Sequence, residues 1–280
     1  MEKSAPLHQC FNPFLAKSYF VKATRGNGQG GPGILPGPFN FTYFGGMDNL
    51  FYVPHLEKGQ FSLPDEEAFH ALKVLRVKRG DELELTNGKG NFAKATVADI
   101  SKKGIVVNVQ HVSLTSHRPV YLHIAIAPTK NADRFEWFLE KATEIGVEEI
   151  TPVICSRSER KEVKWERSHK LLVAAMKQSK QYFLPKLNEA IRFDDFIEQQ
   201  HNGILCIAHC GEGKKIKFRK MAERDHITLL IGPEGDFTGE EIEKAKQKEA
   251  VEVSLGSTRL RTETAGIWAA VSFVNVDSGV

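Results

Sequence analysis

Strand-like and helix-like patterns alternate through the carboxyl-terminal half of the chain, and this alternation constrains the fold more than any other feature. Aliphatic and β-branched residues form patterns of short buried strands at 120–128, 149–155, 203–209, 226–232 and 251–256. Helical patterns separate them at about 132–145, 166–183 and 239–248, and an apolar helix at 262–276 closes the series. This order predicts an α/β domain with a parallel sheet and helices on both faces. Ligands in such domains bind at the carboxyl ends of the strands.

Residues 50–112 show a different pattern, in which short alternating strands predominate. Turn-forming glycines and asparagines separate these strands, and one helical piece at 66–77 interrupts them. Short strands at close spacing are typical of a small barrel or sandwich. A polar linker at 113–119 follows. We therefore predict a small β domain over 47–115 and an α/β domain over 116–280.

We interpret residues 1–46 as an irregular tail without function. The segment holds eight of the 23 glycines and five of the 12 prolines, which oppose both helix and strand. Its Gly26, Gly28 and Gly31 match a dinucleotide-binding pattern, but the prolines that follow exclude the helix which that motif needs. A native tail and a true start at Met47 are both open interpretations.

The composition excludes several classes of protein. With 41% hydrophobic and 26% charged residues, the chain can form a globular core, and no segment is apolar enough to predict a membrane span. The net charge of +3 comes from the tail, so the charge of the whole chain does not indicate a polyanionic partner. The cysteines (Cys10, Cys155, Cys206 and Cys210) are scattered, which favours a reducing, cytoplasmic location and no metal site.

Two loops at predicted strand ends carry the most specific residues. The strand at 226–232 runs into Gly-Pro-Glu-Gly-Asp, and Thr238 and Glu241 then form a predicted capping box. The strand at 251–256 runs into a polar loop with Arg259 and Arg261 before the last helix. Arginine in such a loop suits a carboxylate, a phosphate or a planar base edge. An ordinary turn and a pair of solvated arginines are the alternative interpretations.

Both loops, together with His-Ala-Leu-Lys-Val-Leu-Arg and Asn-Gly-Lys-Gly in the β domain, resemble the RsmE family of 16S ribosomal RNA methyltransferases. This family belongs to the SPOUT, or α/β-knot, class. The resemblance covers Met47 to about Asn275. It implies a trefoil-knotted α/β domain behind a PUA-like β-barrel, a homodimer, and methyl transfer from S-adenosyl-L-methionine to N3 of a uridine in 16S rRNA.

The resemblance also implies a set of site residues. The cofactor would lie between two walls, formed by Gly232, Pro233, Glu234 and Gly235 on one side and by Leu255, Gly256, Leu260 and Thr264 on the other. Arg261 would stabilise the charge that develops on the uracil carbonyls. Glu263 and Glu234 are the carboxylates placed for the general base, and Glu263 is the one we include among the catalytic residues.

Five residues match family positions that we predict to bind RNA, namely His70, Arg76, Lys130, Arg134 and Gln178, and local charge predicts the same role for Arg157. Arg157 opens a basic segment that extends to Lys180 and is a candidate phosphate-binding surface. The alternative interpretations are a buried histidine in the β domain and solvated charged helix faces. Gln181 stands where the family usually has arginine, and Asp236 where it has glycine.

We therefore expect a cytoplasmic, S-adenosylmethionine-dependent methyltransferase of small-subunit ribosomal RNA that needs no metal and no membrane. The target base must be unpaired or flipped out, because N3 lies on the Watson–Crick edge. The alternatives are an enzyme of the same fold that methylates another nucleotide, and a catalytically silent RNA-binding homologue.

Overall fold

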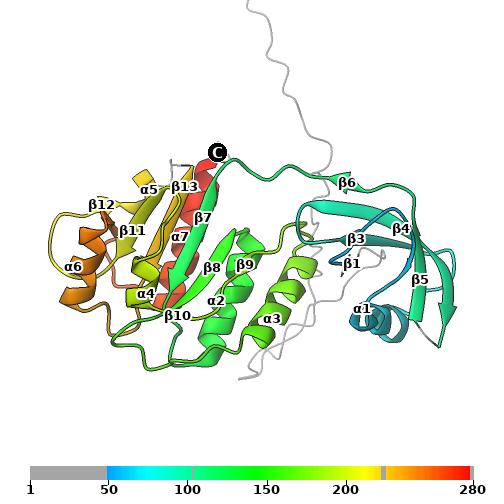
Figure 1. The fold of residues 1–280 in the computed structure, drawn as a ribbon, viewed down its shortest axis with the longest axis horizontal. Coiled ribbons are helices and arrows are strands. Elements are labelled where there is room, and N and C mark those ends of the chain that lie inside the picture. The colour runs from blue at the N-terminus through cyan, green and yellow to red at the C-terminus, as the bar shows by residue number, and fades with distance from the viewer. Residues whose placement is uncertain (1–48, 103, 222–224, 278–280) are drawn as a thin grey trace, which may run out of the picture. The chain divides into compact units, whose positions relative to one another are not determined.

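The computed structural model describes residues 49–102, 104–221 and 225–277. The predicted tail lies outside the described residues. Residues 46–280 form one compact unit. Within that unit the described strands belong to two sheets, one from each of the two predicted patterns (Figure 1).

The first sheet has six strands and confirms the predicted β-rich fold of the front half. Its strands are β1 (Leu50–Tyr52), β2 (Gly59–Ser62), β3 (Glu82–Thr86), β4 (Asn91–Ser101), β5 (Gly104–Val109) and β6 (Ser113–Leu114). They pair in the order β1-β3-β4-β5-β2, and β6 pairs with β4. The segment predicted as a linker at 113–119 therefore begins as a short strand. Successive residues of β3, β4 and β5 largely alternate between buried and more exposed positions, and aliphatic side chains occupy the buried ones.

One helical segment packs on this sheet, as the sequence predicts. Helix α1 (Asp65–His70) continues into a π-helical turn, η1 (Ala71–Leu75), and ends at Arg76, whose φ is 55°. Ala68 and Ala71 face the core of the sheet. Phe69 and Val74 point to solvent, with 64% and 62% of their surface exposed.

The second sheet has eight strands, and all of its pairings are parallel. Its strands are β7 (Tyr121–Ile126), β8 (Glu149–Ile154), β9 (Lys186–Leu187), β10 (Ile191–Arg192), β11 (Ile204–Ala208), β12 (Ile216–Lys217), β13 (His226–Ile231) and β14 (Val251–Ser254). The order is β10-β8-β7-β13-β11-β14-β12, with β9 beside β8. Because all strands are parallel, their carboxyl ends and the loops that follow them meet at one edge of the sheet.

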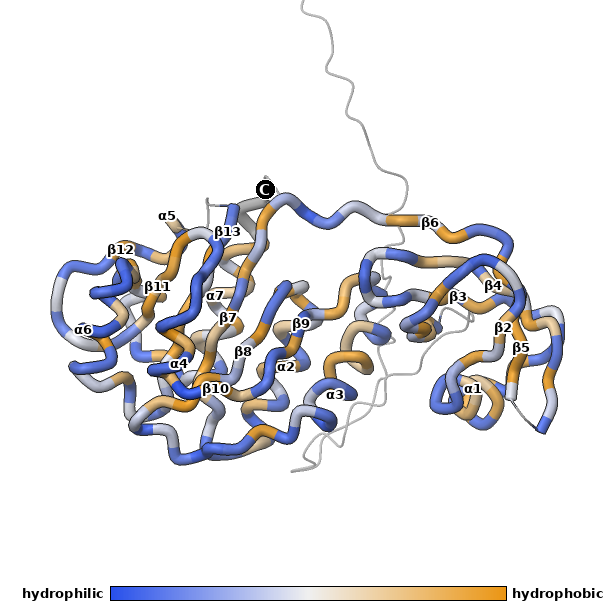
Figure 2. The backbone as a smooth tube through the Cα atoms, viewed as in Figure 1, coloured by the Kyte–Doolittle hydropathy of each residue, from blue (hydrophilic) through white to orange (hydrophobic). Residues whose placement is uncertain are grey.

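Helices cover both faces of this sheet, which confirms the predicted α/β architecture. They are α2 (Ala132–Ile145), α3 (Trp165–Gln178), α4 (Phe193–Ile197), α5 (Phe218–Met221), α6 (Gly239–Gln247) and α7 (Thr262–Asp277). Leu122, Ile124 and Ile126 of β7 pack with α2 and α7 on one face. Ala125 and Ala127 pack with residues of α4 and α6 on the other. Figure 2 shows α6 as a mainly hydrophilic segment, in keeping with its outer position.

Helix α3 ends earlier than the sequence predicts. The pattern indicates a helix to Phe183, but α3 stops at Gln178 and Lys180 takes a left-handed φ of 55°. The amide of Gln181 donates to the carbonyl oxygens of Thr143 (3.0 Å) and Glu144 (2.6 Å) in the last turn of α2. Gln181, at a position where the family usually has arginine, therefore caps the end of α2, where the Thr143 carbonyl oxygen also accepts the Gly146 N–H (3.0 Å).

The last helix returns across the sheet. Strand β14 lies beyond β11, whereas α7 packs on α2, β7 and β13. The segment between them therefore passes the carboxyl ends of β11 and β13. The trefoil knot itself stays a prediction.

Candidate functional site

A cavity of about 600 Å³ opens at the carboxyl edge of the parallel sheet. The loops that follow β13 and β14 form two of its walls, as the sequence predicts. Gly232, Pro233 and Glu234 line it from the first loop, and Leu255, Gly256 and Leu260 line it from the second. The two turns therefore come together although more than twenty residues separate them in the sequence.

Three predicted residues do not line this cavity. Gly235 faces away from it, and its carbonyl oxygen accepts a hydrogen bond from Arg157 (2.8 Å). Thr264 is exposed on the first turn of α7, whereas Glu263 is buried beside it. The predicted donor Arg261 does line the cavity and is exposed.

Sequence reasoning missed a third wall. Ala208 at the end of β11, with His209 and Cys210 just after it, lines the cavity together with Lys215. Nε2 of His209 lies 2.8 Å from Oε1 of Glu252 on β14. Strand β11 ends at the same edge of the sheet as its neighbours β13 and β14, so its position in a predicted parallel sheet could have indicated this wall. The residues themselves form no recognisable motif.

Hydrogen bonds join the walls. The Thr262 hydroxyl donates to the Gly232 carbonyl oxygen (3.0 Å), and the Arg259 guanidinium donates to the Glu234 carbonyl oxygen (3.4 Å). The Cys210 backbone N–H donates to Oδ2 of Asp236 (2.8 Å). These contacts link all three loops, so the cavity is preformed in this structure.

Close packing beneath the first turn favours glycine at position 232. A Cβ atom there would lie 3.0 Å from the ring of Phe237, which is only 3% exposed. Asp236 has a φ of 64°, the left-handed conformation that we expected its glycine-like position to need. Thr238 and Glu241 form the predicted capping box at the start of α6.

The loop between β8 and α3 supports this turn from outside. The Arg157 guanidinium donates to the carbonyl oxygens of Gly235 and Phe237 (2.8 and 3.3 Å), and the Ser156 N–H donates to Glu241 (2.8 Å). Arg160 holds the loop after β7 in the same way, through the carbonyl oxygens of Thr129 and Lys130. The Arg157 guanidinium, which we predicted to bind RNA, thus donates hydrogen bonds to backbone carbonyl oxygens of the protein.

Two of the candidate carboxylates are partly committed to contacts within the protein. Oε1 of Glu234 accepts a hydrogen bond from the Lys130 backbone N–H (2.9 Å). Oε1 of the buried Glu263 lies 3.9 Å from Nε of Arg134, whose side chain is 44% exposed. Lys130 forms an exposed ion pair with Glu159 (2.6 Å). The predicted catalytic and RNA-binding groups therefore adjoin one another around the start of α2 and α7.

The remaining predicted RNA-binding residues lie on other elements. His70 is half-buried and its ring packs against Phe51, with centroids 6.3 Å apart. Arg76 and Gln178 are exposed at the ends of η1 and α3. None of the three lines the cavity.

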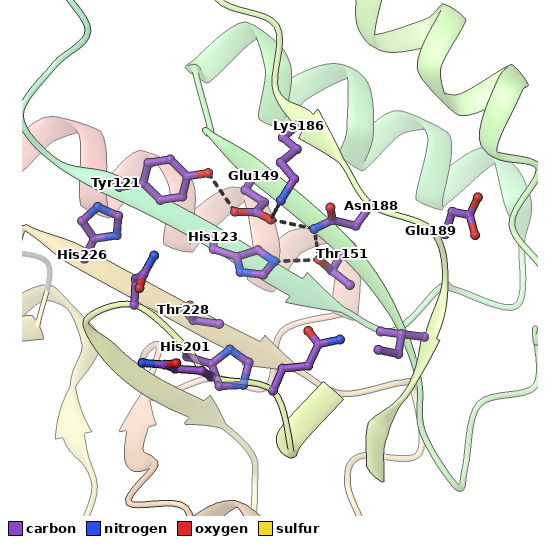
Figure 3. A pocket seen from close by; sticks show the side chains of 14 residues that line it. Tyr121, His123, Glu149, Thr151, Lys186, Asn188, Glu189, His201, His226 and Thr228 are labelled. Carbon is purple, nitrogen blue, oxygen red and sulfur yellow. Dashed lines mark hydrogen bonds and ion pairs between the residues drawn. The ribbon is translucent and has the colours of Figure 1, made fainter. Parts of the chain in front are cut away.

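A second cavity, of about 560 Å³, lies at the opposite ends of the central strands (Figure 3). Oε1 of Glu149 accepts from Lys186 (2.8 Å) and Asn188 (2.7 Å), and Oε2 accepts from the Tyr121 hydroxyl (2.7 Å). Nε2 of His123 lies 2.7 Å from the Thr151 hydroxyl oxygen. Because these polar groups already form hydrogen bonds and an ion pair with one another, the network needs no ligand to satisfy them. We interpret it as structural. No motif in the sequence predicts this cavity.

The electrostatics of this network are unusual for a buried sheet. Burial lowers the pKa of His123 to about 4, so its imidazole is neutral at pH 7. Burial alone would raise the pKa of Glu149, but the charge of a protonated His123 and the donors Lys186, Asn188 and Tyr121 lower it to about 2. Glu149 is therefore ionised at neutral pH.

The two buried thiols are poor candidates for nucleophiles. Cys155 and Cys206 are buried, and burial raises the pKa of both, that of Cys206 to about 12. Within residues 49–277 as described, no three His, Cys, Asp or Glu side chains are grouped so that they could hold a metal ion. The described helices include none that could cross a membrane.

Comparisons with known proteins agree on one family. A model described as an RNA methyltransferase domain matches residues 116–274, and one described as an RNA methyltransferase PUA domain matches residues 63–110. The ribosomal RNA small subunit methyltransferase E of Rickettsia conorii is 30% identical over 220 residues, which cover 76% of this chain and 88% of the relative.

Solved structures give the same result. A probable rRNA-methyltransferase from Porphyromonas gingivalis superposes with a TM-score of 0.75 and 36% identity, covering 82% of this chain and 99% of that one. A ribosomal RNA small subunit methyltransferase E from Neisseria gonorrhoeae, solved with bound S-adenosyl methionine, has a TM-score of 0.72 and 27% identity. That match covers 81% of this chain and 97% of the other.

Proposed function

The chain belongs to the RNA methyltransferase family whose members include ribosomal RNA small subunit methyltransferase E, and from this we propose that it methylates small-subunit ribosomal RNA. We propose N3 of a uridine as the acceptor and S-adenosyl-L-methionine as the donor. The observation that carries the proposal is the convergence of three strand-end loops on one cavity at the carboxyl edge of the sheet.

The cavity fits such a cofactor in size and in chemistry. Its volume of about 600 Å³ falls in the usual range for small-molecule sites. Glu234 offers a carboxylate to the cationic amino and sulfonium groups, and Lys215 and Arg259 offer cations to the carboxylate. When bound, the cofactor supplies an electrophilic methyl group.

The protein must provide orientation and charge stabilisation for the acceptor. A uridine N3 becomes nucleophilic when it loses its proton, and negative charge then spreads to the flanking carbonyl oxygens. The exposed Arg261 guanidinium at the cavity can stabilise that charge. Glu263 stays our proposed proton acceptor, and its neighbour Arg134 would orient its carboxylate.

RNA contacts and subunit pairing are further parts of the proposal. Lys130 and Arg134 are exposed beside the cavity loops, and His70, Arg76 and Gln178 would contact RNA elsewhere. About two-fifths of the surface of each of three apolar side chains is exposed, namely Trp137 on α2 and Trp268 and Val271 on α7. Because α2 and α7 pack together, this apolar surface supports a homodimer. The substrate would place the enzyme in the cytoplasm.

Mass spectrometry of ribosomal RNA nucleosides from a deletion strain tests the function. We expect 3-methyluridine to disappear, and to return with the wild-type gene but not with Arg261→Ala. Arg219→Ala, which changes an exposed arginine of α5 outside the cavity lining, is the matched control and should restore methylation. Disappearance of another methylated nucleoside would overturn the N3 assignment. An unchanged nucleoside profile would overturn the activity.

A further inference from the structure

Asp236 makes contacts that a residue in an ordinary turn would not make. Its Oδ2 accepts the Cys210 backbone N–H (2.8 Å), and its Oδ1 accepts the Phe237 backbone N–H (2.8 Å). Its own N–H donates to the Pro233 carbonyl oxygen (2.9 Å), which closes the turn. One carboxylate therefore fixes the shape of the first cavity loop and joins it to the third wall.

The third wall is held at two points, one on each side. On one side, His209 bonds to Glu252 of β14, and the Gly211 N–H donates to Nδ1 of the same imidazole (3.1 Å). On the other side, the bond from the Cys210 N–H to Asp236 is the direct link to the loop after β13. Strands β11 and β13 pair up to Ala208 and Ile231, so beyond this last pair the spacing between Cys210 and the turn after β13 depends on Asp236.

We infer that Asp236 is a positioning residue that sets the width of the cofactor cavity by tying the segment after β11 to the turn after β13. The inference rests on the proposed function, because it assigns the cavity to the methyl donor. A preformed cavity spares the bound cofactor the entropy of ordering its walls. Removal of the carboxylate should therefore weaken cofactor binding and leave the fold intact.

The backbone makes this separation of effects possible. Asp236 has a φ of 64°, which glycine adopts without a steric penalty. Asp236→Gly therefore adds no backbone strain, although it removes both hydrogen bonds of the side chain. Cys210 is exposed, so water can replace the lost partner of its N–H. At Cys210 the loss is then one of position, and the second lost bond, from the part-buried Phe237 N–H, lies within the turn itself.

The chain offers a matched control at Glu249. This exposed acidic residue also has a left-handed φ, of 61°, and it follows α6 outside the lining of the cavity. Glu249→Gly therefore also removes an acidic side chain and places glycine at a left-handed φ, but it leaves the cavity walls unchanged. Asp236→Asn retains one side-chain oxygen, which can accept the Cys210 N–H and so keep the link between the walls, while the charge and the bond from the Phe237 N–H are lost.

Calorimetric titration with S-adenosylmethionine, combined with steady-state methylation of small-subunit RNA, tests the inference. We expect Asp236→Gly to raise the dissociation constant and the KM for the cofactor about tenfold, or about 1.4 kcal/mol, with kcat and the melting temperature nearly unchanged. Asp236→Asn should bind the cofactor more tightly than Asp236→Gly, because it can keep the link to Cys210, and Glu249→Gly should match the wild type.

The outcomes separate this inference from the function on which it depends. Wild-type protein that does not bind S-adenosylmethionine would overturn the proposed function. Wild-type binding with an Asp236→Gly affinity within twofold of it would overturn the positioning role alone. A lower kcat at unchanged KM would also overturn that role, because a residue that positions the cofactor walls acts on binding.

Discussion

Gly266→Ala should destabilise the protein, although alanine is the better helix former. Gly266 lies in α7, and a Cβ atom there would come within 2.4 Å of Cε2 of Phe138 and 3.1 Å of Cδ1 of Ile126. Both side chains are fully buried, so neither can move into solvent. Overpacking costs about 1–3 kcal/mol, and the contact distance favours the upper value. The higher helix propensity of alanine offsets about 1 kcal/mol of this loss in the free energy of unfolding.

We therefore expect a net loss of about 2 kcal/mol, or about 4–8 °C in melting temperature for a chain of this size. Gly239→Ala is the control, because this glycine begins α6 and its Cβ would meet no atom within 4 Å. It should raise the melting temperature slightly. Denaturant unfolding and calorimetry measure both variants. A Gly266→Ala protein as stable as the wild type would refute the close approach of α7 to α2.

Two further predictions concern stability. Burial lowers the pKa of His123 to about 4 from 6.5, so the unfolded state binds its proton first. The free energy of unfolding should then fall by about 3 kcal/mol between pH 6.5 and 4. His123→Gln should flatten this part of a pH–denaturation profile, and an unchanged slope would contradict the assignment. Thr238→Ala removes one side of the capping box and should cost about 1 kcal/mol in denaturant unfolding, whereas full stability would show that the cap is dispensable.

The sequence predicted the α/β class because strand and helix patterns differ in period. Helix α2 matches its predicted range, from the Asn131 N-cap to Gly146 with its φ of 94°. Helices α4 and α5 were missed because they have five and four residues, too few to show a helical period. The order of strands, with β13 between β7 and β11, follows from packing between distant segments and leaves no mark in local sequence.

The site was predicted in part for a similar reason. Glycines and prolines marked the loops after β13 and β14, but Ala208–Cys210 carries no such motif, so its wall appeared only in the structure. The basic segment at 157–180 predicted a surface for phosphate. Local charge could not reveal that the Arg157 guanidinium bonds to carbonyl oxygens of the cavity loop. The partner of an arginine depends on the tertiary fold.

Hydrogen–deuterium exchange with and without S-adenosylmethionine tests the central claim most directly, because it reports which segments the cofactor orders. The account predicts slower exchange in the three loops at 208–215, 232–238 and 255–262. Exchange around Tyr121, Glu149 and residues 199–202 of the second cavity should stay unchanged. No protection in the three loops, or protection confined to the second cavity, would contradict it.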